Sequence, residues 1–161
     1  KNTLNDNNEL IEKISYNFLK TSSLFVLGKG NLKFVSDEGS LKIKEITYIH
    51  SESYALSALR HGPYALLNEN IPVIFLVNDD SNINLVNSTI EEIKSRNSMV
   101  YCITNNNLVS SKSDININVS YNELFNGLLL NIPIQILSYY VSIIKGNNPD
   151  KPRNLAKCVS V

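Results

Sequence analysis

Apolar residues occur along the chain in two patterns, as short continuous runs and as longer stretches with helical spacing. The short runs are "SLFVLG" (23–28), "PVIFLVN" (72–78) and "MVYCIT" (99–104), which have the length and apolar content of buried strands. The stretches with apolar residues on one helical face are 7–20, 32–45, 82–96 and 122–145. The pattern therefore predicts helices and buried strands in alternation.

Such alternation, with short connections, predicts a parallel sheet covered by helices on both faces, with ligands outside the carboxyl ends of the strands. The glycines of "GKGN" (28–31) allow a sharp turn from the first strand into a helix. "DININVS" (114–120) alternates in polarity and should be an edge strand. Pro133, inside the last helix, predicts a kink or the loss of one hydrogen bond. The predicted fold class is α/β.

Composition limits the classes of function. The 161 residues, 43% of them hydrophobic, suffice for one domain with a real core. Fifteen basic and fifteen acidic side chains cancel, so neither nucleic acid nor an anionic membrane is an expected partner. The opening "KNTLNDNNEL" lacks a signal core, and Asn131, Pro133 and Gln135 interrupt the most apolar stretch, so no membrane span is expected. Cys102 and Cys158 show no paired or metal-binding spacing, which fits a cytoplasmic protein.

The chain closes with "GNNPDKPRNLAKCVSV" (146–161), which follows a domain assigned to residues 1–145. This tail has prolines and no apolar periodicity. Its default interpretation is a loosely ordered surface extension.

Glu38, Lys42 and Glu45 fall on one face of the helix predicted from Leu32. They can form a solvated ladder of ion pairs worth a few tenths of a kcal/mol per pair. Alternatively, Glu45 faces a pocket, where desolvation would raise its pKa into the range of a general base. Spacing alone favours the ladder.

Three other side chains are candidates for chemistry. His61 precedes Gly62 and Pro63, which fix a turn and present the imidazole at a defined place. His50 lies in an expected strand and reads as an ordinary half-buried histidine; the two histidines lack further ligands for zinc. Lys157, between Ala156 and Cys158, has flanks that allow desolvation, which would make its amine nucleophilic toward a carbonyl.

Several segments, in this order, resemble the C-terminal part of the glutamine:fructose-6-phosphate aminotransferases (isomerising), also called glucosamine-6-phosphate synthases. They are "EGSLKIKEITYIHSESY", "LRHGPYALL", "PVIFLV" and "KPRNLAK", and the resemblance runs from about Leu24 to the end of the chain. It implies the second of two sugar isomerase (SIS) domains, a five-stranded parallel sheet between helices with flavodoxin-like topology, followed by the irregular tail.

The resemblance also implies roles for five residues. Glu45 would move the proton between C1 and C2 of the sugar, with Lys42 as a second charged group of the site. His61 would assist ring opening in the neighbouring subunit of a homodimer. Lys157 would form an imine with the C2 ketone of fructose 6-phosphate, and Ala156 would contact the substrate through its backbone. The product would be glucosamine 6-phosphate, and the reaction requires neither a metal nor an organic cofactor.

The chain also departs from the family. It contains neither the glutaminase domain nor the first SIS domain, whose Ser/Thr-rich loop holds the sugar phosphate. Lys29, Cys158 and Ser57-Ala58 replace an arginine, a serine and Gly-Glu of the family. We therefore expect an excised or separately encoded isomerase half with little or no synthase activity alone.

Two alternatives to the enzyme remain open, a non-catalytic SIS sensor of sugar phosphates and a dimerisation module. The joint presence of Glu45, His61 and Lys157 argues against a sensor, because a sensor needs no imine-forming lysine.

Overall fold

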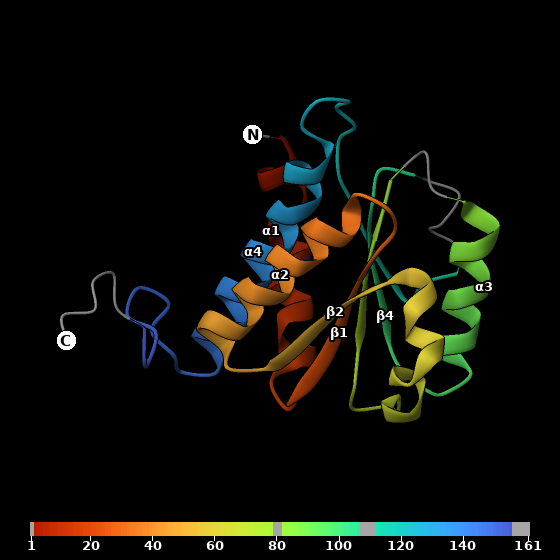
Figure 1. Ribbon diagram of the computed structural model, residues 1–161. Helices are drawn as coiled ribbons and strands as arrows, with labels where there is room; N and C mark the ends of the chain where they lie inside the picture. Colours follow the sequence, from red (N-terminus) through yellow and green to blue (C-terminus); the bar gives the residue numbers. More distant parts are fainter. Residues whose placement is uncertain (1, 79–81, 107–111, 156–161) are drawn as a thin grey trace, which may run out of the picture.

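The computed structural model describes residues 2–78, 82–106 and 112–155, with side chains from Asn7 onward. Its centre is one sheet of five parallel strands in the order β2-β1-β3-β4-β5 (Figure 1). This is the strand order of flavodoxin-like folds. The strands are β1 (Ser23–Gly28), β2 (His50–Ala55), β3 (Val73–Val77), β4 (Val100–Thr104) and β5 (Ile115–Asn118).

Helices cover both faces of the sheet and make three layers (Figure 1). One face carries α1 (Asn2–Ser15), α2 (Leu32–Thr47) and α4 (Asn126–Ile144). The other face carries α3 (Ile83–Lys94) and the 3₁₀ helices η2 (Leu56–His61) and η3 (Pro63–Leu66), and a further 3₁₀ helix, η1 (Tyr16–Phe18), follows α1. The predicted three-layer α/β fold with a five-stranded parallel sheet is confirmed.

Alternate residues of each central strand enter two separate cores, as a two-residue period requires. Val26 of β1 packs with α1, α2 and α4, whereas Phe25 and Leu27 pack with α3 and η2. Cys102 of β4 is fully buried in the second core, and burial raises the pKa of its thiol to about 12. An unreactive thiol in a strand agrees with the absence of any predicted role for Cys102.

The first helix differs from the predicted range of 7–20. It begins earlier, at Asn2, ends at Ser15, and tightens into η1. The hydroxyl of Ser15 donates a hydrogen bond of 2.6 Å to the carbonyl of Glu12, a local bond that competes with continuation of the helix.

The last helix begins at Asn126 rather than at residue 122. The Asn122 side chain accepts hydrogen bonds from the backbone N–H groups of Leu124 and Phe125, which forms a turn before the helix. The helix then continues through Pro133.

The length and mean hydropathy of α4 would suffice to cross a membrane, but 44% of its most apolar window is buried inside the domain. Leu130, Ile134, Leu137 and Val141 belong to the first core, where α4 packs beside α1 and α2. One side of α4 therefore belongs to the first core.

Candidate active site

A cavity of about 720 Å³ lies between the carboxyl-terminal end of α2 and the chain that follows α4. Lys42 and Glu45 of α2 line one side. The other side is lined by Pro149, Asp150, Lys151, Pro152 and Leu155. Figure 1 shows this last segment beside the lower end of α2. The volume is within the range of small-molecule sites.

Lys42 is the central charge of the α2 face. Its ammonium lies 2.9 Å from the Glu45 carboxylate and 3.4 Å from that of Glu38. The hydrogen bond to Glu45 raises the pKa of Lys42, so the amine stays protonated and is no nucleophile at neutral pH. The sequence allowed two interpretations of Glu45, as part of an ion-pair ladder or as a residue that faces a pocket. The structure contains both, because Glu45 pairs with Lys42 and also lines the cavity.

The described part of the tail is held against the end of α2. The Asn147 amide donates to the backbone carbonyls of Ile46 and Thr47, at 3.1 and 3.4 Å. The backbone N–H of Arg153 donates to the Tyr48 hydroxyl at 2.9 Å, and the Arg153 guanidinium lies 4.1 Å from the centre of the Tyr48 ring. The default interpretation of this segment as a loose extension was therefore wrong for residues 147–153. No local sequence pattern indicates these contacts, because the partners are about a hundred residues apart.

Lys157, Ala156 and Cys158 lie outside the described residues. Leu155, which lines the cavity, is two positions from Lys157. The roles assigned to Lys157 and Ala156 stay predictions.

His61 is exposed and ends η2, on the face of the sheet opposite to α2. Gly62 follows with φ +140°, a conformation that favours glycine, and Pro63 begins η3. The predicted turn is thus present, but within one chain His61 does not reach the cavity that contains Glu45.

His50 begins β2 and its side chain is 65% exposed, so the expectation of a half-buried histidine was wrong. Its Nδ1 lies 3.3 Å from the Ser23 hydroxyl and its Nε2 lies 3.7 Å from the Glu52 carboxylate. As the edge of the sheet, β2 leaves this side chain in solvent.

The cavity with Glu45 lies away from the carboxyl ends of the strands, where ligands were expected. Because α2 starts after β1 and runs back to the start of β2, Glu45 lies near the amino ends. A separate hollow of about 380 Å³ does lie at the carboxyl ends, between the starts of α2 and α4. It is lined by Asn31, Leu32, Val35, Asn78, Tyr121, Glu123, Leu124, Asn126 and Gly127.

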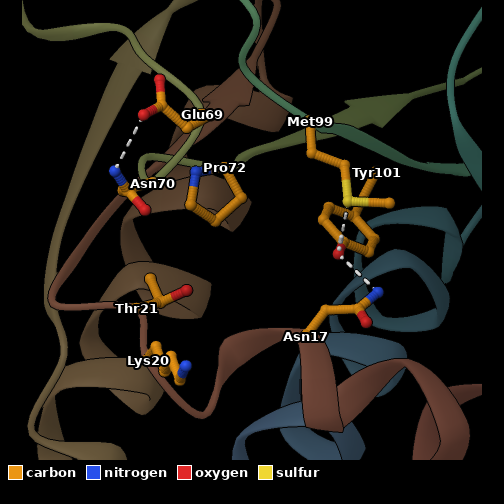
Figure 2. Close-up of a pocket in the computed structure, with 8 residues that line it drawn as sticks. All are labelled: Asn17, Lys20, Thr21, Glu69, Asn70, Pro72, Met99 and Tyr101. Carbon is orange, nitrogen blue, oxygen red and sulfur yellow. Dashed lines mark hydrogen bonds between the residues drawn. The ribbon is translucent and has the colours of Figure 1, made fainter.

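A third hollow, of about 90 Å³, is shown in Figure 2. The Tyr101 hydroxyl accepts a hydrogen bond from the Asn17 amide at 3.0 Å and donates to the Met99 sulfur at 3.1 Å (Figure 2). The volume of this hollow is below that of ordinary small-molecule sites. We assign no role to it.

Comparison with known proteins gives a family match over most of the chain. The model of the SIS domain matches residues 17–145. The chain belongs to the SIS-domain family. Among solved structures, this SIS domain is similar to the C-terminal domain of glucosamine-fructose-6-phosphate aminotransferase from Francisella tularensis. The TM-score is 0.82 at 30% identity, over 91% of this chain and 42% of that one.

The curated relatives are named as aminotransferases of the same kind as this solved structure. A protein of Acanthamoeba polyphaga mimivirus named "Probable glutamine-fructose-6-phosphate aminotransferase (isomerizing)" is 46% identical over 151 residues. The glutamine-fructose-6-phosphate aminotransferase (isomerizing) of Idiomarina loihiensis is 38% identical over 154 residues. Each match covers 94% of this chain and 25% of the relative, so the chain spans about a quarter of the length of these relatives.

Proposed function

We propose that this SIS domain is the isomerase half of an isomerising glutamine:fructose-6-phosphate aminotransferase. The complete enzyme would convert fructose 6-phosphate and glutamine-derived ammonia to glucosamine 6-phosphate, in the cytoplasm, as a homodimer that also contains a glutaminase domain and a first SIS domain. The observation that carries the proposal is the cavity shared by Lys42, Glu45 and the tail segment that ends at Leu155. That segment ends two positions before the candidate nucleophile, Lys157.

In the proposed mechanism the Lys157 amine attacks the C2 carbonyl of the open sugar, and water leaves as the imine forms. Ammonia then attacks C2 of this imine and the lysine amine leaves, so the nitrogen of ammonia is held at C2 as a new imine. The imine acidifies the C1 proton because it accepts the electron pair that deprotonation leaves. The Glu45 carboxylate takes this proton from C1 and returns it to C2, and the C1 hydroxyl loses its proton as C1 becomes the aldehyde of the product.

The sequence position of Lys157 supports the proposal, because Lys157 follows Leu155, a residue that lines the cavity, by two positions. Arg153 contacts Tyr48, three positions after Glu45, so the described part of the tail lies against the end of α2. His61, exposed on the opposite face, is free to enter the site of a second subunit.

Borohydride trapping tests the proposal. The chain is incubated with fructose 6-phosphate and borohydride, with and without the first SIS domain, and the modified lysine is located by peptide mass spectrometry. We expect a reduced adduct on Lys157 when the first SIS domain is supplied, because that domain holds the phosphate.

Two variants give matched controls. Lys157→Arg should abolish the adduct, whereas Lys151→Arg, in the same cavity, should retain it. An adduct in neither condition would favour the sensor or the dimerisation module over the enzyme.

A further inference from the structure

The turn that carries His61 is tied to α3 by four side chains, Arg60, Tyr64, Glu92 and Arg96, which we call the Glu92 cluster. Arg60 donates two hydrogen bonds to the Glu92 carboxylate, from Nε at 3.0 Å and from Nη2 at 2.6 Å. The Tyr64 hydroxyl donates a third, at 2.7 Å. A single carboxylate of α3 thus receives donors from both η2 and η3.

The two donor residues flank His61 in the sequence. Arg60 directly precedes it and Tyr64 follows three positions later, so both ends of the turn are bound to the same group. Gly62, with φ +140°, lies between them. The residues on both sides of His61 are therefore bonded to α3, although the imidazole itself is in solvent.

The ionisation of the cluster keeps these bonds in place at neutral pH. Burial, followed by the hydrogen bond to Glu92, raises the pKa of Tyr64 to about 12, so the hydroxyl remains a donor. The hydrogen bond from Tyr64 lowers the pKa of Glu92, and Arg60 lowers it further, so the carboxylate remains charged.

Arg96 completes the cluster. Its guanidinium lies 4.4 Å from the centre of the Tyr64 ring and donates to the backbone carbonyl of Glu92. A cation over the ring disfavours rotation of Tyr64 away from Glu92.

We propose that Glu92 is a positioning residue for His61, which holds the turn in one conformation so that the imidazole is presented to the site of a second subunit. The inference deepens the proposed function and depends on it for the role of His61. No catalytic contact is assigned to Glu92 itself.

The first test measures the turn directly in the 161-residue chain, by ¹⁵N relaxation. Glu92→Gln should lower the order parameter of the Gly62 amide from about 0.85 to below about 0.6, because the charge-assisted bonds to Arg60 are lost. Arg60→Gln should lower the order parameter of the Gly62 amide in the same way, because it removes the donor of the same hydrogen bonds. Glu91→Gln is the matched control, because Glu91 is the neighbouring carboxylate of α3 and pairs instead with Lys112, at 2.6 Å. An order parameter that stays near 0.85 in both Glu92→Gln and Arg60→Gln would overturn the proposal.

The second test measures turnover in the full-length enzyme. Glu92→Gln should lower kcat about tenfold with KM for fructose 6-phosphate nearly unchanged, since a displaced catalytic group costs rate and not substrate binding. His61→Ala is measured in parallel. If His61→Ala is inactive while Glu92→Gln retains full kcat, Glu92 does not position His61. If His61→Ala retains full turnover, the role of His61 in the proposed function fails, and the inference fails with it.

Discussion

Glu45→Gln in the full-length enzyme is expected to lower kcat by a factor of about 10²–10⁴, the range of general acid–base catalysis. Glutamine has nearly the same shape but cannot accept the C1 proton. Imine formation should persist, because the lysine attack at C2 does not use this carboxylate. The measurement is the exchange of the C1 proton with deuterated solvent, followed by NMR, together with borohydride trapping of the imine.

Glu38→Gln is the matched control for this prediction. Glu38 pairs with the same ammonium of Lys42, at 3.4 Å, but is not among the residues that line the cavity. The Glu38→Gln variant should exchange the C1 proton at the same rate as the unaltered enzyme. The comparison therefore distinguishes the loss of the catalytic base from the loss of one negative charge on α2. Unchanged exchange in Glu45→Gln would refute the assigned role.

Gly28→Ala is expected to destabilise the domain by about 3 kcal/mol, at the upper end of ordinary overpacking. A Cβ atom at this position would lie 2.2 Å from the carbonyl oxygen of Leu32 and 2.8 Å from the backbone N of Lys33. Both are backbone atoms of the first turn of α2, so the strand and the helix would have to separate. Urea unfolding followed by circular dichroism measures the change.

Gly39→Ala provides the comparison within α2. Its Cβ would lie 2.6 Å from Cδ1 of Ile134, the end of a flexible side chain that can rotate. We expect a cost below about 1.5 kcal/mol, partly offset by the better helix propensity of alanine. Equal destabilisation by the two substitutions would contradict the backbone contact at Gly28.

The strands could be predicted because buried parallel strands are continuous apolar runs. Val73–Val77 and Val100–Thr104 are fully buried and agree with the sequence within one residue at each end. Helix ends were predicted less well. They depend on single side chains such as Ser15 and Asn122, whose hydrogen bonds to nearby backbone leave little trace in apolar periodicity.

The candidate site could be predicted only in part, for a related reason. The spacing of three positions placed Lys42 and Glu45 on one face, because residues three or four positions apart are neighbours on the surface of a helix. No spacing rule links Tyr48 to Arg153, or Arg60 to Glu92, since these pairs depend on how distant elements pack. The cavity and the Glu92 cluster therefore appear only in the three-dimensional structure.

The central claim is that the Lys157 amine and the Glu45 carboxylate share one cavity. Zero-length carbodiimide coupling tests it, in a Lys42→Arg chain so that the ammonium 2.9 Å from Glu45 cannot react in place of Lys157. With the first SIS domain present and without fructose 6-phosphate, which would occupy the amine as an imine, we predict an amide bond between Glu45 and Lys157, identified by peptide mass spectrometry. Coupling of Lys157 only to carboxylates of the opposite face, such as Glu91 or Glu92, with none to Glu45, would contradict the account.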